Sequence, residues 1–545
     1  MNGKSTHRRE LKMKRNDENV TPMLTDLYQI TSTYAYWKTD KHQDPVTFDM
    51  FYRKNPFGGA FSIFAGLSRF LDFVENFRFT EADIAYLKSV LPQTVELDFF
   101  EWLMALDCST IKVTAVPEGT VVFPRVPLVT IEGPRGIAQL LETTLLNLVN
   151  SSTLTATKAA RMRDIAGFDA QILEFGARRA AGPDGAMTAS EAAYLGGFDA
   201  TSNVLAGQLL GIPVRGTHPH SYVNSFESLA DLYPSPSIDR AFVENVLKYR
   251  TELGNYFLLD PTHEGELSAF IAYATAFPDG FLGLVDTYST MRSGVPNFLF
   301  VALALMDLGH QPLGIRLDSG DLGQLSREAR RLFRDVGCAC KRDLSFLKIC
   351  ASNDIDEDTL IALCASGHEI DIFGIGTKLV SSGETLGGVY KLVENKDTPC
   401  SKYSEDPIKI PIAGRKEVVR FYNRFGRPEC DYLYFADEDF SDLWQFDGES
   451  RSIIGYVPFS KESVILSLRN ASWCAPLRKV YWKGGQTSHV PSLEASRAYV
   501  LAQLKELPTS YQFGEIEMVE PQRVFLSTKL YALNQELLAI NKRKK

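Results

Sequence analysis

The stretch Gly314–Gly323 combines a short apolar run with one arginine and two aspartates. In that run Ile and Leu alternate with Arg316, which is typical of a short buried strand. Asp318 and Asp321 come next, with a serine and a glycine between them, and an amphipathic helical pattern begins at residue 322. Carboxylates and an arginine at a helix N-terminus could hold a cation and an anionic ligand together. A capped turn with solvated acids would explain this stretch equally well, so a site has to be argued from the rest of the chain.

Two other apolar runs end in residues suited to phosphate. Gly374 and Gly376 stand on either side of an isoleucine and precede Thr377, so backbone N–H groups there can approach a phosphate closely. The segment Glu174–Arg179 includes Arg178, and planar guanidinium groups suit phosphate or carboxylate recognition. A single Gly-x-Gly is common in turns, and a surface ion pair is the alternative for one of the two arginines. Together with the aspartates, these residues indicate a phosphate-bearing substrate with a magnesium ion.

The elements that must position these residues are seven short apolar runs that alternate with helical patterns. They cover residues 170–175, 200–204, 212–216, 281–285, 313–317, 346–349 and 370–375. Repeated strand–helix units predict a parallel sheet, open or closed. Polar or charged residues follow every run, for example Asn353 and Asp354 after the run at 346–349. Because the C-terminal strand ends of an α/β barrel form one rim around one site, this pattern favours an active site over a purely structural barrel.

The remaining segments predict a second domain. Residues 21–135 and 400–545 both mix helical and strand patterns, and we expect them to form one discontinuous α+β domain. Residues 136–399 are then an irregular, incomplete TIM-like α/β barrel that carries the active site. Residues 1–20 are basic and lack an apolar segment, so we expect a disordered tail, with a transit peptide as the alternative.

Composition excludes several classes of function. The net charge of −9 does not favour a nucleic-acid partner. No apolar run approaches the roughly 20 residues that cross a bilayer, so we expect no membrane partner. Eight scattered cysteines without a Cys-x-x-Cys pair indicate a reduced intracellular protein without structural zinc. We expect a cytoplasmic location, with nuclear or organellar locations as open alternatives.

Several motifs together resemble the nicotinate phosphoribosyltransferase family. They are Thr25–Gln29, Phe51–Phe57, Leu145–Arg161, Glu174–Gly185, Gly216–Ser221, Leu284–Tyr288, Gly314–Leu322 and Gly374–Thr377. Each is unspecific alone, but the combination in the family's order is specific. The resemblance implies transfer of a phosphoribosyl group from phosphoribosyl pyrophosphate to nicotinate, giving nicotinate mononucleotide and pyrophosphate in NAD salvage. It also implies ATP as a co-substrate, used through a phosphohistidine.

The resemblance implies a nicotinate pocket. Arg316 is similar to the family position that meets the nicotinate carboxylate, where a bidentate ion pair would select the acid over the amide. Phe175 and Tyr28 resemble the aromatic residues on the two faces of the ring, with Tyr28 supplied by the second subunit of a homodimer that shares its active sites. Thr217 resembles another ring-side position. Core packing for Phe175 and a helix-face contact for Tyr28 are the alternatives.

The resemblance also implies how the ribose–pyrophosphate bond is broken. Asp286 and Asp318 could balance the positive charge that develops on the sugar. Mg²⁺ or Mn²⁺, held by Asp318 and Asp321, could balance the leaving group together with Arg178.

Phosphate groups have expected partners by the same resemblance. Thr377 and the amides of Gly374 and Gly376 would hold the 5′-phosphate. Lys158, on the helix before the first strand of the barrel, would face the pyrophosphate.

His220 is similar to the family's phosphorylated histidine. Imidazole is nucleophilic near neutral pH and can carry a phosphoryl group. His218 lies two residues away, and only the family pattern, with the active histidine directly before the serine, separates the two. Pro219 between them is less usual, which leaves the path of the loop open. Phosphate binding or turn capping is the alternative role for His220.

Other classes of protein remain as alternatives. Nicotinamide phosphoribosyltransferase is the nearest, although Glu-Phe-Gly-x-Arg-Arg and Thr-Asp-Leu-Tyr favour the nicotinate enzyme. A quinolinate enzyme would be shorter and would need more basic residues around the ring. A non-catalytic barrel acting as a binding or scaffold protein is disfavoured by the presence of His220, Arg316, Asp318 and Asp321. A metal-dependent aldolase-type barrel leaves the two histidines and the flanking domain unexplained.

Overall fold

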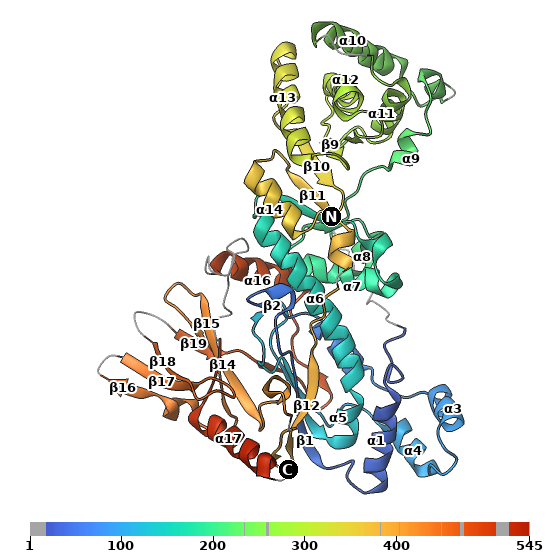
Figure 1. Ribbon diagram of the computed structural model, residues 1–545. Helices are drawn as coiled ribbons and strands as arrows, with labels where there is room; N and C mark the ends of the chain where they lie inside the picture. The colour runs from blue at the N-terminus through green and yellow to red at the C-terminus, as the bar shows by residue number, and fades with distance from the viewer. Residues whose placement is uncertain are drawn as a thin grey trace, which may run out of the picture. The chain divides into compact units, whose positions relative to one another are not determined.

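The computed structural model describes residues 18–233, 235–257, 261–381, 383–402, 404–447, 450–468, 473–507 and 523–543 (Figure 1). The chain forms two compact units. Unit 1 is drawn from Met1–Ala160, Glu191–Gly197 and Ser382–Lys545, and unit 2 from Arg161–Ser190 and Phe198–Ser381. The domain boundaries expected from the sequence stay a prediction, and the basic tail lies outside the described residues up to residue 17.

Unit 2 is a mixed α/β structure with a six-stranded sheet in the order β7-β6-β11-β10-β9-β8. Its strands are β6 (Gln171–Glu174), β7 (Ala200–Thr201), β8 (Leu282–Leu284), β9 (Gly314–Leu317), β10 (Lys348–Ser352) and β11 (Ile372–Ile375). Every neighbouring pair is parallel, which confirms the predicted parallel sheet. Because all six strands run the same way, their C-terminal ends share one edge of the sheet, and loops from that edge carry the candidate site.

The pairings of the described residues do not close this sheet into a barrel. They leave β7 and β8 as its two edges. The prediction of a strand at residues 212–216 is wrong, because this segment forms only an isolated bridge, between Val214 and Thr201, among the described residues. Pro213 lacks an N–H group, so this segment cannot continue a regular ladder. The run at 200–204 ends early, since Asn203 caps helix α8 (Val204–Leu210) by accepting a hydrogen bond from the Ala206 N–H.

Helices connect the central strands in chain order. α12 (Val295–Asp307) follows β8, α13 (Leu322–Cys340) follows β9, and α14 (Glu357–Ser366) follows β10. α12 is apolar and buried along nearly its whole length because α10 (Arg240–Phe257) and α11 (Glu264–Ala276) pack against it. Residues 221–279, the long insertion between β7 and β8, therefore supply helices that bury α12. Shorter elements of unit 2 are η2 (Ala177–Arg179), α7 (Gly182–Leu195, which continues into unit 1), α9 (His220–Val223), η3 (Leu229–Leu232), η4 (Thr290–Gly294) and α15 (Thr377–Val380).

Unit 1 contains two larger sheets, each with strands from distant parts of the sequence. The first has the order β13-β12-β1-β5-β3-β20-β21 and is antiparallel. Its strands are β1 (Pro45–Phe51), β3 (Lys112–Ala115), β5 (Val129–Pro134), β12 (Val389–Asn395), β13 (Thr398–Pro399), β20 (Lys479–Lys483) and β21 (Gln486–Thr487). Strands from the N-terminal and C-terminal thirds thus share hydrogen bonds within one sheet.

The second sheet of unit 1 comes from the C-terminal segment alone, in the order β16-β17-β22-β15-β14-β19, with β18 paired to β17. Its strands are β14 (Lys416–Tyr422), β15 (Pro428–Phe435), β16 (Gln445–Asp447), β17 (Ser450–Tyr456), β18 (Ser463–Leu468), β19 (Trp473–Pro476) and β22 (Val524–Leu526). Arg420 and Asp431 form a fully buried, two-pronged ion pair across β14 and β15, at 2.7 and 2.8 Å. Removing either partner would leave an uncompensated buried charge, so this pair fixes the register of the two strands.

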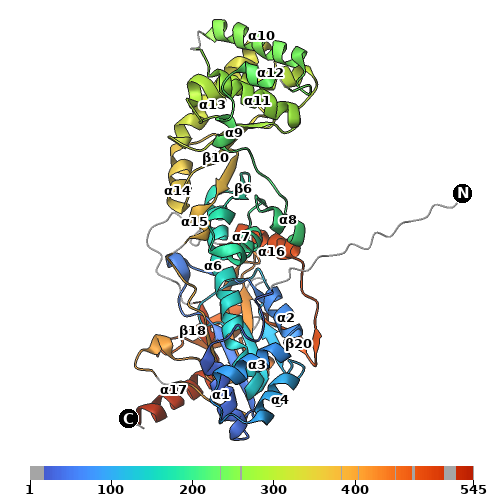
Figure 2. The same cartoon turned by 90° about the vertical axis from the view of Figure 1, so that its right-hand side faces the viewer.

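Unit 1 also contains helices, which Figure 2 shows from a second direction. They are α1 (Leu27–Lys38), α2 (Leu67–Glu75), α3 (Glu81–Val90), α4 (Leu97–Ala105), α5 (Arg135–Leu140), α6 (Glu142–Ala166, which continues into unit 2), α16 (Leu493–Glu506) and α17 (Thr528–Arg543). None of the helices in the described part of the chain is long and apolar enough to span a membrane.

Candidate active site

His220 is the first residue of α9, and its imidazole lies among a hydroxyl and two carboxylates. Nδ1 is 3.1 Å from Thr287 Oγ1, while Nε2 is 3.6 Å from Asp318 Oδ2 and 3.9 Å from Asp286 Oδ1. The ring is 40% exposed, so a ligand can reach it. This setting holds the ring in place and leaves it accessible, as a nucleophile requires.

The two carboxylates follow neighbouring strands and are tied to each other. Asp286 comes after β8, and its Oδ2 accepts hydrogen bonds from the Asp318 N–H and from the Ser319 hydroxyl. Its Oδ1 is buried without a hydrogen-bond partner among the described residues and lies 3.9 Å from His220 Nε2. Two strand ends thus place two carboxylates beside one imidazole, as the predicted rim requires.

The guanidinium group of Arg316, in β9, donates hydrogen bonds to three side chains. Nε donates to Ser352 Oγ at 2.8 Å, Nη1 to Thr217 Oγ1 at 3.0 Å, and Nη2 to Asp318 Oδ1 at 3.1 Å. Its Cζ lies 5.5 Å from the centre of the Phe175 ring. A guanidinium has about five N–H groups, so roughly two remain for a ligand such as a carboxylate.

Phe175 packs closely against Gly374 in β11 and Gly376 directly after it. A Cβ on Gly374 would lie 2.5 Å from Cε2 of the Phe175 ring, and one on Gly376 would lie 3.0 Å from the Phe175 carbonyl oxygen. The absence of side chains at these glycines is therefore explained by packing against Phe175. A role of their amides towards phosphate stays a prediction.

Thr377 and Arg178 lie at the ends of the adjacent strands β11 and β6. Thr377 is the first residue of the short helix α15 and is partly exposed. Arg178 in η2 is exposed and forms no hydrogen bond or ion pair within the described part of the chain. Both side chains are accessible to a ligand at the same edge of the sheet.

His218 occupies a different environment from His220. It is 4% exposed, accepts a hydrogen bond from the Leu284 N–H at 3.2 Å, and packs against the rings of Phe270 and Tyr273. Burial lowers the pKa of His218 to about 4, so the ring is neutral at physiological pH. His218 therefore supports β8, and of the two histidines only His220 faces the carboxylates.

The two expected metal ligands, Asp318 and Asp321, are only partly available to bind a cation. Asp321 caps α13, since its side chain accepts a hydrogen bond from the Gln324 N–H at 2.9 Å. Asp318 already accepts bonds from Arg316 and Ser352 with Oδ1. Within the described ranges no group of three or more His, Cys, Asp or Glu residues could hold a metal ion. These residues fit a magnesium ion only where substrate phosphate oxygens supply other ligands, which is how Mg²⁺ is usually bound.

Two hydroxyl residues of the site were not predicted as site residues. Ser352, the last residue of β10, bonds both Arg316 and Asp318, whereas the sequence favoured the next two residues. Those two, Asn353 and Asp354, have φ angles of 101° and 46° and are exposed in the turn that follows the strand. Thr287 stands inside a recognised motif, but nothing in the sequence showed that its hydroxyl would meet His220.

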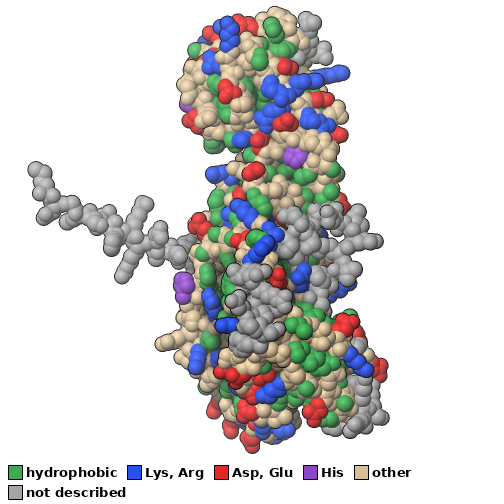
Figure 3. Space-filling model, turned by 90° about the vertical axis from the view of Figure 1, so that its left-hand side faces the viewer, with side chains coloured by type: hydrophobic (Ala, Val, Ile, Leu, Met, Phe, Trp, Pro, Cys, Tyr) green, Lys and Arg blue, Asp and Glu red, His purple; other side chains and the backbone are tan. Residues whose placement is uncertain are grey.

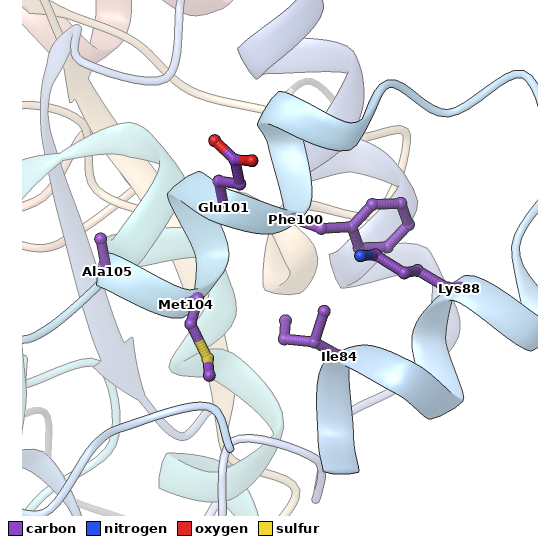
Figure 4. Close-up of a pocket in the computed structure, with 6 residues that line it drawn as sticks. All are labelled: Ile84, Lys88, Phe100, Glu101, Met104 and Ala105. Carbon is purple, nitrogen blue, oxygen red and sulfur yellow. The ribbon is translucent and has the colours of Figure 1, made fainter. Parts of the chain in front are cut away.

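Two pockets lie away from this cluster. One of about 370 Å³ lies between α3 and α4 in unit 1 and is lined mainly by Ile84, Phe100 and Met104, with the Lys88 amine 5.4 Å from the centre of the Phe100 ring (Figure 4). A larger one of about 910 Å³ is lined by α13 and by the loops that precede β10 and β11, at the opposite edge of the parallel sheet from His220. On the face drawn in Figure 3, basic and acidic side chains are interspersed.

Comparison with known proteins decides the family. Residues 23–150 match the model of the nicotinate phosphoribosyltransferase (NAPRTase) N-terminal domain, and residues 415–534 match that of the C-terminal domain. The chain is 43% identical over 531 residues to the nicotinate phosphoribosyltransferase of Homo sapiens, covering 95% of this chain and 97% of that one. The chain belongs to the nicotinate phosphoribosyltransferase family. The resemblance inferred from the motifs is confirmed, and the protein is an enzyme of the transferase class.

Other members and structures agree with this family. The nicotinate phosphoribosyltransferase of Caenorhabditis elegans is 45% identical over 512 residues, covering 90% of this chain and 88% of that protein. The crystal structure of human nicotinic acid phosphoribosyltransferase superposes with a TM-score of 0.82 at 40% identity, covering 94% of this chain and 99% of that one. A nicotinate-nucleotide pyrophosphorylase from Pyrococcus furiosus, with a TM-score of 0.59 at 20% identity, shares the fold.

Two residues that the family resemblance singled out belong to unit 1. Tyr28 on α1 is half exposed, and burial together with Glu142 raises its pKa to about 12. Lys158 on α6 lies with Nζ 5.6 Å from the centre of the Phe57 ring. Their roles towards the nicotinate ring and the pyrophosphate stay predictions.

Proposed function

We propose that this member of the nicotinate phosphoribosyltransferase family transfers a phosphoribosyl group from phosphoribosyl pyrophosphate to nicotinate, with ATP hydrolysis coupled through a phosphohistidine at His220. The observation that carries the proposal is the position of Arg316. Its guanidinium lies near the Phe175 ring with N–H groups to spare, and it shares Asp318 with the His220 cluster. One cluster in unit 2 therefore offers a partner for an aromatic acid beside groups that can assist transfer.

Recognition of the acid follows from Arg316. A nicotinate ring at Phe175 would direct its carboxylate to the free N–H groups of the guanidinium, giving a charge-assisted pair. Thr217 and Ser352 hold the guanidinium in orientation, so little side-chain freedom is lost on binding. Nicotinamide offers no negative charge to Arg316, so the acid is preferred.

Bond cleavage separates charge in a way that the carboxylates can balance. The C1′–O bond of phosphoribosyl pyrophosphate breaks, pyrophosphate leaves with the electron pair, and the pyridine nitrogen forms the new C1′–N bond. Asp286 and Asp318 stabilise the positive charge that develops on the sugar. Asp318 and Asp321 would hold a divalent magnesium or manganese ion, which when bound neutralises charge on the pyrophosphate. Arg178 and Thr377, with the amides of the β11 glycines, contact the phosphates.

ATP coupling uses the imidazole. With the proton on Nδ1, donated to Thr287 Oγ1, the lone pair of His220 is on Nε2. This nitrogen attacks the γ-phosphorus of ATP, the bond to the bridging oxygen breaks, and ADP leaves with that electron pair. Water later cleaves the N–P bond and releases phosphate.

The finer architecture and assembly are part of the same proposal. We infer that the parallel sheet belongs to an incomplete TIM-like barrel in residues 136–399, flanked by an α+β domain from residues 21–135 and 400–545. Tyr28 then reaches the nicotinate ring of a second subunit in a cytoplasmic homodimer, which explains a half-exposed tyrosine on a surface helix.

One assay tests the reaction. The protein is incubated with phosphoribosyl pyrophosphate, Mg²⁺ and ATP, and nicotinate, nicotinamide and quinolinate are offered separately. The expected product is nicotinate mononucleotide, formed from nicotinate alone and faster with ATP. Formation of the nicotinamide nucleotide at a comparable rate would contradict the assignment of Arg316 as the group that selects the acid.

A further inference from the structure

The loop of residues 285–294, between β8 and α12, supplies two of the groups that meet His220. Thr287 Oγ1 lies 3.1 Å from Nδ1 and Asp286 Oδ1 lies 3.9 Å from Nε2. The position of this loop therefore determines how the imidazole is oriented and which charge it faces. The loop ends in η4, a single π-helical turn, a form that is uncommon and frequent at functional sites.

A buried glutamate holds the end of this loop. Glu266 in α11 is fully buried, and its Oε2 accepts hydrogen bonds from Ser293 Oγ in η4 and from Asn297 Nδ2 in α12, the latter at 3.0 Å. Asn297 also donates to the His263 carbonyl oxygen, and the His263 N–H donates to Ser293 Oγ at 2.9 Å. The start of α11, the end of the loop and the start of α12 thus share one buried hydrogen-bond network.

Two further contacts restrict the loop. The Tyr288 ring stacks on His263, with centroids 3.7 Å apart and planes 14° from parallel. Gly294 packs directly on the Val285 backbone, since a Cβ there would lie 1.8 Å from the Val285 carbonyl oxygen. Because the loop is held at its middle and closed on itself at its ends, the network around Glu266 determines where Asp286 and Thr287 point.

We propose that Glu266 is a positioning residue, which acts through Ser293 and Asn297 to hold the 285–294 loop with Asp286 and Thr287 against His220. Glu266 touches none of the reacting groups itself. The inference rests on the proposed function of His220. It concerns a residue in the long insertion, outside all of the family motifs in the sequence.

Substitution separates hydrogen bonding from charge. Glu266→Ala removes the buried acceptor that Ser293 Oγ and Asn297 Nδ2 share, so the loop loses the link that joins its end to α11. Glu266→Gln keeps an amide oxygen in the same place for both donors and should restore most of the function. Ser293→Ala removes one bond of the network and should give a smaller effect in the same direction, which keeps the inference testable where Glu266→Ala fails to fold.

A matched control exists in unit 1. Glu118 is also buried, and its carboxylate accepts hydrogen bonds from the backbone N–H groups of Gly66 and Leu67 at the start of α2. Glu118→Ala should lower thermal stability as Glu266→Ala does, and it should leave the kinetics of the folded protein unchanged.

The experiment measures the rate of phosphoenzyme formation from γ-labelled ATP, together with kcat, the nicotinate KM and the melting temperature. For Glu266→Ala we expect phosphorylation and kcat to fall by roughly ten- to a hundredfold, as for other displaced catalytic groups. The nicotinate KM should stay within about twofold, because the three side chains that bond Arg316, those of Ser352, Thr217 and Asp318, all lie outside this loop.

Three results would overturn the inference. They are an unchanged kcat in Glu266→Ala, a loss of kcat no greater than in Glu118→Ala of equal melting temperature, or no restoration by Glu266→Gln. Wild-type protein that forms no phosphoenzyme would instead refute the role proposed for His220. In that case the split between kcat and KM still decides whether Glu266 positions Asp286.

Discussion

The Ser352 hydroxyl accepts a hydrogen bond from Arg316 Nε at 2.8 Å, across the adjacent parallel strands β9 and β10. The same hydroxyl donates to Asp318, so one serine joins the guanidinium expected to bind nicotinate to a carboxylate beside His220. This arrangement makes the orientation of Arg316 depend on a side chain that has no charge and contacts no reacting group.

Ser352→Ala should therefore weaken nicotinate binding without abolishing the reaction. Loss of a hydrogen bond to charged groups costs about 1.5–3 kcal/mol, and part of this is recovered because Arg316 keeps Thr217 and Asp318. We expect the nicotinate KM to rise roughly tenfold in steady-state assays, by the usual conversion of 1.4 kcal/mol to a factor of ten. Ser345→Ala, at the amino end of β10, is the control, and an equal rise there would argue against a specific role for Ser352.

Arg316→Ala should raise the nicotinate KM by about one to two orders of magnitude, because it removes a charge-assisted pair worth about 1.5–3 kcal/mol. Arg316→Lys should restore little, since an ammonium cannot reproduce the planar fork that bonds Ser352, Thr217 and the ligand. Arg334→Ala, an exposed arginine on α13, is the matched control. An unchanged KM in Arg316→Ala would remove this residue from the nicotinate pocket.

His220→Ala should abolish stimulation by ATP and leave slow transfer from phosphoribosyl pyrophosphate, because the carboxylates and Arg316 remain in place. The measurement compares nicotinate mononucleotide formation with and without ATP. His310→Ala serves as control, since the partly exposed His310 ring pairs with Asp279 and with none of the described residues of the candidate site. ATP stimulation that survives in His220→Ala would refute the phosphohistidine at this position.

His218 should make stability depend on pH. Its pKa is about 4 in the folded state against a usual 6.5, so between these values the unfolded state binds more protons. Stability contributed by the neutral ring is present above pH 6.5 and is lost as the pH falls towards 4, by up to on the order of 3 kcal/mol.

The pH dependence that His218 causes is tested by comparing the melting temperatures of wild type and variants. Burial raises the pKa of Glu266 to about 7, so this group opposes the effect by losing stability as the pH rises from 4.5 to 7. The drop in melting temperature from pH 7 to pH 5 should therefore be compared between wild type and His218→Gln. We expect a smaller drop in the variant, while His310→Gln should behave as wild type. An equal drop in all three proteins would show that His218 is not buried as a neutral ring.

Much of the site could be predicted because a parallel sheet brings its strand ends together. Asp286, Asp318 and Arg316 follow from that rule alone, since alternating apolar runs identified their strands. The strand expected at residues 212–216 is not formed, because Pro213 lacks the N–H group that a continued ladder needs. The pairings of the described residues leave the parallel sheet open, and the incomplete barrel stays a prediction.

Residues whose contacts depend on tertiary packing could not be predicted from the sequence. The sequence favours Asn353 and Asp354 over Ser352. A shift of one residue at the end of a strand decides whether a side chain faces the site or the solvent. Glu266 lies in a helix of the long insertion, and its burial against η4 and α12 depends on tertiary contacts that no local pattern encodes. His218 and His220 differ only in their surroundings, which their positions in the sequence do not show.

Identifying the phosphorylated residue is the most direct test of the role proposed for His220. Wild-type protein is labelled with γ-labelled ATP, and the peptide that spans residues 215–222 is fragmented by mass spectrometry under conditions that preserve phosphohistidine. We expect a phosphoryl group on His220, the histidine that faces Asp286 and Asp318, and none on the buried His218. A label on His218, or on a residue outside this peptide, would contradict it.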